Sequence, residues 1–240
     1  MNLTINENAF KTEVGPVKKG ADITIMTGHF GSGKTETAIN LALEVRRNHG
    51  KVAVADLDIV NPYYRARDTK AVLEDHGIEL IAPAERLAAA DLPIVPGDMG
   101  RLIDDPAYKL IVDAGGDKDG ATALGQFFND WKYLNPEVLF ILNANRPYVS
   151  TLEGAVETLR KIEKASRLSV TGIINNSNVG NETTIEDVQK GLELSRKLSD
   201  ALGIPLMHAV LPEHLSDQIG ELEGAPVKVM TRYLKLPWEM

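Results

Sequence analysis

The chain has 240 residues, of which 43% are hydrophobic, and its 26 Lys and Arg against 34 Asp and Glu give a formal net charge of −8. This composition is ordinary for a globular protein and excludes collagen-like, disulfide-rich and strongly disordered classes. The chain has no cysteine, which excludes disulfides, Cys-ligated zinc, iron–sulfur clusters and thiol nucleophiles within it.

Neither the charge nor the N-terminus points to a nucleic-acid or membrane partner. The acidic balance argues against nucleic-acid binding through overall charge. No segment reaches the roughly 18 apolar residues of a membrane-spanning helix, and residues 1–20 lack the apolar core of a signal peptide. We therefore expect a cytoplasmic protein, with residues 1–20 as a leader or edge segment and residues 21–240 as one nucleotide-binding domain.

Along residues 21–240, short apolar runs alternate with segments of helical periodicity. The predicted strands are 23–26, 52–55, 78–81, 110–112, 138–142, 170–174 and 206–210. The predicted helices are 35–47 (ended by Gly50), 150–165 (capped by Ser150), 184–202 (bounded by Thr184 and Gly203) and 227–234, with a short helix and loops over 85–107. This alternation predicts an α/β fold, a three-layer, doubly wound, mostly parallel sheet of about seven strands.

The sharpest motif is G-x-x-x-x-G-K-T, formed by Gly28, His29, Phe30, Gly31, Ser32, Gly33, Lys34 and Thr35. It lies between a predicted strand and a predicted helix, as a phosphate-binding loop requires. Glycines let backbone N–H groups turn toward phosphate oxygens, and the helix N-terminus adds its positive end. Lys34 is predicted to contact the β- and γ-phosphates as a catalytic residue, and Thr35 to bind Mg²⁺. We include the following residue, Glu36, in the predicted nucleotide site.

Two acidic segments follow predicted strands at the edge where a parallel sheet binds ligands. Asp113 ends the strand at 110–112 and is predicted to hold Mg²⁺, directly or through water, with Gly116 offering its N–H to the γ-phosphate. The alternative is an Asp that caps the next turn. Asp56 and Asp58 follow the strand at 52–55, and alternation puts both carboxylates on one side of the chain. Asp58 is predicted to orient or deprotonate the attacking water and Asp56 to support the Mg²⁺ shell, against the alternative of a solvated loop.

The order and spacing of these segments resemble the MinD/ParA branch of P-loop ATPases, which is grouped with the CobQ/CobB nucleotide-binding domains. The likeness is carried by residues 28–35, 56–59, 81–84, 110–116 and 173–178. It implies a P-loop NTPase fold, Mg-ATP binding and slow hydrolysis, coupled to a nucleotide-controlled homodimer. It also implies that Asp58 is the catalytic Asp of switch I, that switch II follows Asp113, and that Asn175 or Asn176 reads adenine. These two Asn residues can alternatively cap a turn.

The chain departs from that family pattern in three ways. His29 occupies the position where most members carry a signature lysine that reaches across the dimer, and a shorter, mostly neutral imidazole puts that mechanism in doubt. The cysteines of the metal-cluster carriers are absent. The C-terminal stretch is only weakly amphipathic, which favours a core-packing helix over a membrane anchor.

The sequence therefore predicts a Mg-dependent ATP-binding protein, a slow ATPase that acts as a nucleotide-controlled switch on an unidentified protein client. ATP is favoured over GTP because no N-K-x-D guanine reader follows the strand at 138–142. Two alternatives stay open: a P-loop kinase or ligase that acts on a small molecule, and a GTPase-type metallochaperone.

Overall fold

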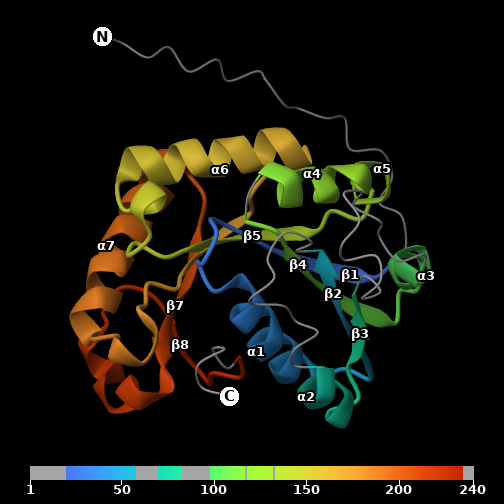
Figure 1. Ribbon diagram of the computed structural model, residues 1–240, viewed down its shortest axis with the longest axis horizontal. Helices are drawn as coiled ribbons and strands as arrows, with labels where there is room; N and C mark the ends of the chain where they lie inside the picture. Colours follow the sequence, from blue (N-terminus) through green and yellow to red (C-terminus); the bar gives the residue numbers. More distant parts are fainter. Residues whose placement is uncertain (1–19, 58–69, 83–97, 117, 132, 235–240) are drawn as a thin grey trace.

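The computed structural model describes residues 20–57, 70–82, 98–116, 118–131 and 133–234, and it contains one eight-stranded sheet of order β3-β2-β4-β1-β5-β6-β7-β8 (Figure 1). All seven neighbouring pairs of described strands are parallel. The strands are β1 (Asp22–Thr27), β2 (Lys51–Leu57), β3 (Glu79–Ile81), β4 (Tyr108–Ala114), β5 (Glu137–Leu142), β6 (Gly172–Asn175), β7 (Leu206–Pro212) and β8 (Val227–Met230).

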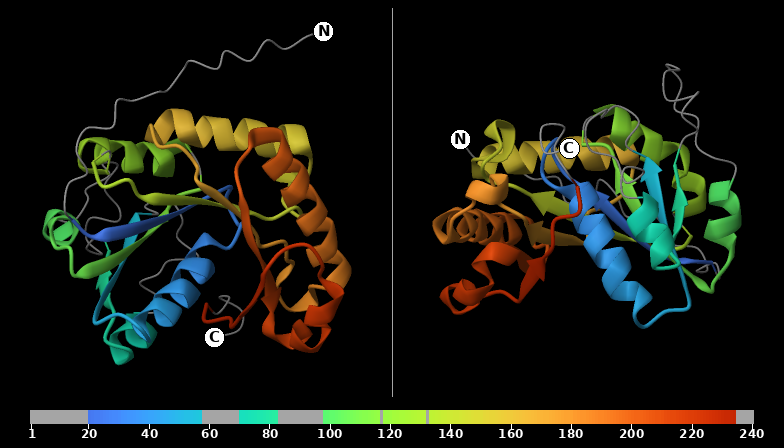
Figure 2. Two further views of the ribbon diagram at one scale, coloured as in Figure 1. Left: turned by 180° about the vertical axis from the view of Figure 1, so that it is seen from behind. Right: turned by 60° about the horizontal axis from the view of Figure 1, so that its bottom comes forward.

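Helices lie on both faces of this sheet (Figures 1 and 2). The helices are α1 (Lys34–Arg46), α2 (Lys70–Asp75), α3 (Asp98–Asp104), α4 (Lys118–Gln126), α5 (Phe128–Trp131), α6 (Leu152–Ser166) and α7 (Ile185–Leu202), with short 3-10 turns η3 (Pro147–Val149), η4 (Gly180–Glu182) and η5 (Glu213–Glu221). Helices α4 and α6 pack on one face, and α1 and α2 on the other. Alternate residues of β1 accordingly enter different cores: Ile25 packs with the α4–α6 side, whereas Met26 packs with α1. The predicted three-layer, doubly wound α/β fold is confirmed.

The C-terminal region differs from its prediction, because residues 227–230 form β8 and not the start of a helix over 227–234. The apolar residues Val227, Met230 and Leu234 are spaced i, i+3 and i+7, as on one face of a helix, and this spacing favoured the wrong prediction. In the structure, β8 pairs with β7 from Ala209↔Val227 to Pro212↔Met230. Val227 packs against a cluster formed with α7, and Met230 against the α1 side. The sheet thus gains an eighth strand, which satisfies backbone groups that β7 would otherwise leave unpaired at its edge.

Helix boundaries agree with the sequence at α7, where Thr184 caps the N-terminus in a capping box with Asp187 and Gly203 adopts the left-handed C-terminal conformation. Two predicted caps are wrong. Thr151, not Ser150, caps α6 by accepting a hydrogen bond from the Gly154 N–H. Helix α1 ends at Arg46, one residue before its predicted end, and its C-terminal cap is Arg47, not Gly50. Helix α3 falls within the stretch where a short helix was expected, whereas the predicted leader over residues 1–19 lies outside the described residues.

Candidate nucleotide site

The phosphate-binding loop connects β1 to α1, the strand and helix that the motif requires. Gly33 has a left-handed φ of 86°, and a Cβ atom there would lie 2.2 Å from Asn176 Nδ2, so only glycine fits. The Ser32 N–H donates to the His29 carbonyl at 3.1 Å, and Lys34 Nζ donates to the same carbonyl at 3.2 Å. The loop therefore curls around the lysine at the N-terminus of a 13-residue helix, the geometry of an anion site.

The acidic residues meet the loop because β4 and β1 are neighbours in the sheet. The Thr35 hydroxyl donates to Asp113 Oδ2 at 2.6 Å, and both side chains are buried. Asp56 is buried as well and lies opposite Asp113 in the β2–β4 register. A hydroxyl beside carboxylates supplies the oxygen donors that Mg²⁺ prefers, so Thr35, Asp113 and Asp56 fit the predicted metal site. Asp58 lies outside the described residues.

Gly116 brings the segment after β4 into contact with the phosphate-binding loop. A Cβ atom at this position would lie 2.6 Å from Lys34 Nζ and 2.6 Å from the Phe30 backbone nitrogen. Nothing larger than glycine can approach the loop this closely without a shift. Glycine at position 116 thus lets the predicted switch segment lie against the loop, next to the predicted γ-phosphate position.

The side chains of His29 and Phe30 lie at the outer edge of the loop. The His29 Nδ1–H donates to the Phe30 carbonyl at 2.9 Å, a tautomer that follows because a carbonyl can only accept. Its ring centroid lies 5.3 Å from that of Tyr148, which is 73% exposed. Arg146 Nε donates to the Gly31 carbonyl at 2.8 Å. The segment after β5 therefore supports the loop through this hydrogen bond, a role that the sequence did not assign to Arg146.

The two candidate adenine readers have different surroundings. Asn175 is fully buried, donates to the Val188 carbonyl at 3.0 Å, and accepts from the Ser177 hydroxyl at 2.7 Å. Asn176 donates to the Ser32 carbonyl at 2.7 Å and lines the pocket next to the loop. Of the two, only Asn176 both contacts the loop and lines the pocket.

A pocket of about 760 Å³ extends from the loop toward the ends of β6, β7 and β8. One end contains Lys34 and Thr35. The other end is formed by residues 178–181, by 212–214 and by the chain after β8. This volume lies within the usual range of small-molecule sites. A nucleotide with its phosphates on the loop would direct its base toward the far end.

The C-terminal segment is a part of the site that the sequence missed. The buried Glu36 carboxylate accepts the backbone N–H groups of Tyr233 and Leu234, the latter at 3.1 Å. Burial raises the pKa of Glu36, although these two hydrogen bonds oppose the shift. Asn40, one turn later, exchanges two hydrogen bonds with the Thr231 backbone. Helix α1 thereby holds residues 231–234, which form one wall of the pocket, and the Glu36 carboxylate is occupied by hydrogen bonds to this wall.

The sequence of this chain matches the CobQ/CobB/MinD/ParA nucleotide-binding domain over residues 23–227. It belongs to this family. The match spans β1 to the start of β8 and includes the phosphate-binding loop, Asp56, Asp113 and Asn176. This member of the CobQ/CobB/MinD/ParA family is therefore a P-loop nucleotide-binding protein. No curated protein matches the sequence closely enough to count as a relative.

Solved structures of the same fold come from the FtsY proteins. The cell division protein FtsY of Thermotoga maritima matches with a TM-score of 0.51 and 20% identity, over 84% of this chain and 66% of that one. Chloroplast FtsY of Physcomitrella patens matches with a TM-score of 0.54 and 19% identity, over 85% and 63% of the two chains. The family member thus spans less than two thirds of either FtsY chain, and at this identity the likeness is one of fold. Within the part of the chain that the structure describes, no helix is long and apolar enough to cross a membrane.

Proposed function

We propose that this protein binds ATP with Mg²⁺ and hydrolyses it slowly, and that its nucleotide state controls association with a second copy or with a protein client. The single observation that carries the proposal is the Thr35–Asp113 hydrogen bond at the mouth of a complete phosphate-binding loop. A cytoplasmic location, expected from the sequence, belongs to the same proposal.

Positioning and charge stabilisation account for the chemistry that these residues can perform. Backbone N–H groups of residues 28–35 would hold the phosphates, and Lys34 would move from the His29 carbonyl to the β- and γ-phosphate oxygens. The Gly116 N–H, held against the loop, would contact the γ-phosphate. Such preorganised donors stabilise charge that develops on transferring phosphoryl oxygens. Asp58 is proposed as the residue that orients the attacking water.

Mg²⁺ would be held by Thr35 and Asp113, with Asp56 supporting its shell. When bound, the ion neutralises charge on the β- and γ-phosphates. The proposal is supported by the oxygen donors that meet there and by their burial, which strengthens their electrostatic interactions.

ATP is proposed over GTP because no N-K-x-D guanine reader follows β5. Arg146, which lies in this segment, donates a hydrogen bond to the phosphate-binding loop. Asn176 is the proposed adenine contact. Its amide presents both a donor and an acceptor, which matches the edge of adenine.

The switch is proposed without a lysine that crosses the dimer. His29 contacts the Phe30 carbonyl and the Tyr148 ring of its own chain. We therefore propose that nucleotide-dependent association uses other groups at this edge; among the described residues, the large side chains of Phe30 and Tyr148 are exposed there.

The test measures phosphate release and molecular mass together. Purified protein is incubated with Mg-ATP or Mg-ADP, and light scattering records its mass in each state. We expect slow phosphate release that Lys34→Ala abolishes, and a molecular mass or partner affinity that differs between Mg-ATP and Mg-ADP. Phosphate transfer to a metabolite would instead identify the protein as a kinase or ligase. Tighter binding of GTP than ATP would favour the metallochaperone alternative.

A further inference from the structure

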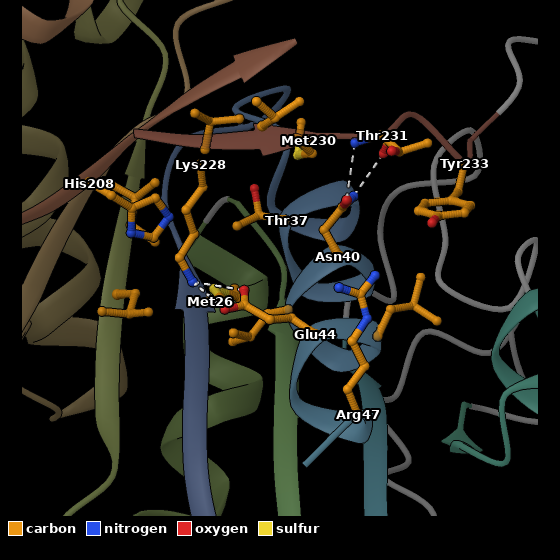
Figure 3. A pocket seen from close by; sticks show the side chains of 16 residues that line it. Met26, Thr37, Asn40, Glu44, Arg47, His208, Lys228, Met230, Thr231 and Tyr233 are labelled. Carbon is orange, nitrogen blue, oxygen red and sulfur yellow. Dashed lines mark hydrogen bonds and ion pairs between the residues drawn. The ribbon is translucent and has the colours of Figure 1, made fainter. Parts of the chain in front are cut away.

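A second pocket of about 370 Å³ lies between α1 and strands β5–β8, on the outer side of the nucleotide site (Figure 3). Its lining shares a single residue, Met230, with the nucleotide pocket. The chain after β8 separates the two: Thr231 and Tyr233 line the second pocket, whereas Arg232 and Leu234 line the nucleotide pocket. Alternate residues of one segment thus face two different cavities.

The floor of the second pocket is apolar. It is formed by one side chain from each of four adjacent strands: Met26, Leu139, Ile174 and Val210, all at most 5% exposed. Such a floor favours the apolar body of a ligand, because the ligand's own apolar surface leaves water when it lies against these side chains. The volume is near the lower end of small-molecule sites, so the body must be small.

The rim carries a net positive charge. Its charged residues are Glu44, Arg47 and Lys228, and Lys228 Nζ pairs with Glu44 at 2.7 Å. His208 also lines the rim, and burial together with the Lys228 cation lowers its pKa to about 4, so the ring is neutral at pH 7. Within the described residues, no hydrogen bond or ion pair engages the Arg47 guanidinium.

Arg47 is therefore the cation left over after the Glu44–Lys228 pair is formed. Figure 3 shows its side chain running along α1 toward the segment of Thr231 and Tyr233, beside the pocket. A guanidinium binds a carboxylate or sulfonate through two parallel N–H donors. An apolar floor with one unpaired cation at the rim is complementary to an amphipathic molecule that carries one negative charge.

We propose that this second pocket binds a small amphipathic monoanion, an aromatic or aliphatic body with a single carboxylate or sulfonate. The apolar body would occupy the floor over β5–β7, and the anionic group would contact Arg47. The site is independent of nucleotide binding, since the chain after β8 stands between the two cavities.

The probe for the test is 8-anilinonaphthalene-1-sulfonate, an aromatic monoanion whose fluorescence rises in apolar surroundings. Fluorescence titration of the native protein is expected to show one saturable site. Arg47→Glu should weaken binding about tenfold, because a favourable charge contact becomes a repulsive one, and Arg47→Lys should restore most of the affinity. His208→Trp, which enlarges a ring that lines the pocket, should weaken binding without a change in charge.

Two controls define the location. Lys190→Glu makes the same charge change on the exposed surface of α7 and should bind the dye within twofold of the unaltered chain. Saturating Mg-ATP, directed at the nucleotide pocket, should leave the affinity for the dye unchanged within the same limit. The proposal is overturned if the unaltered protein has no saturable site, if Arg47→Glu binds as tightly as the unaltered chain, if Lys190→Glu weakens binding as much as Arg47→Glu, or if Mg-ATP displaces the dye. Circular dichroism of each variant verifies that its fold is retained.

Discussion

Replacement of Gly116 by alanine tests whether the segment after β4 must touch the phosphate-binding loop. The added Cβ would lie 2.6 Å from both Lys34 Nζ and the Phe30 backbone nitrogen, and 2.8 Å from the His29 carbonyl carbon. Ordinary contacts of this kind begin near 3.4 Å. The two segments must therefore separate by about 1 Å, since two of the three contacts are with backbone that cannot rotate away.

A displacement of this size has a predictable cost. Misplacement of binding groups by about 1 Å can reduce the rate about 100-fold, and overpacking lowers stability by about 1–3 kcal/mol. We expect Gly116→Ala to hydrolyse ATP at least ~30-fold more slowly and to melt at a lower temperature. The assays are steady-state phosphate release and thermal unfolding.

The matched control is Gly50→Ala, because a Cβ at Gly50 meets nothing within 4 Å and its φ is not positive. This variant should hydrolyse ATP at the rate of the unaltered protein. If Gly116→Ala also does so, the close contact between the predicted switch segment and the loop has no part in the reaction, and the reasoning is refuted.

Three further changes probe the metal site, acid stability and loop support. Asp113→Asn keeps an acceptor for the Thr35 hydroxyl but removes the negative charge. Calorimetry should therefore find that Mg²⁺ no longer strengthens ATP binding, and a Mg²⁺ effect equal to that of the unaltered protein would contradict the metal assignment. His208 has a pKa lowered to about 4, so its stabilisation is present above pH 6.5 and is lost as the pH falls toward 4. In urea unfolding between pH 7 and pH 5, His208→Gln should lose less stability than the unaltered chain by at most about 2 kcal/mol, discounted for partial exposure, and equal losses in the two proteins would contradict this reasoning. Arg146→Ala removes a hydrogen bond to a loop carbonyl and should lower stability by about 1 kcal/mol and weaken nucleotide binding severalfold; unchanged affinity would mean that the loop needs no such support.

The sheet was largely predictable because its strands are short apolar runs followed by polar strand ends. Buried parallel strands must be apolar on both faces, so seven of the eight strands stand out in the sequence. Strand β8 does not, since it has four residues, includes Lys228, and shares a helical spacing of apolar residues with Leu234. Only the unpaired edge of β7 explains why this segment is extended, and that edge is a property of the assembled sheet.

The phosphate-binding loop and the meeting of Thr35 with Asp113 were predictable, because a local motif and the rule for parallel strand ends define them. The pocket wall formed by residues 231–234 was not predictable. Glu36 and Asn40 hold backbone atoms nearly 200 positions away along the chain, and no local pattern records which backbone a buried carboxylate will meet. The difference between Asn175 and Asn176 likewise depends on Val188 and Ser32, which come from other elements.

Calorimetric titration measures whether the loop at residues 28–35 binds ATP with Mg²⁺. ATP is titrated into the unaltered protein and into Lys34→Ala, with Mg²⁺ and with a chelator. We expect one saturable site in the unaltered protein that binds ATP more tightly with Mg²⁺ than with the chelator. Lys34→Ala should lose at least ~10-fold in affinity, the cost of a charge-assisted contact. Absence of ATP binding with Mg²⁺ present, or equal affinity in Lys34→Ala, would contradict the assignment of the loop as the ATP site.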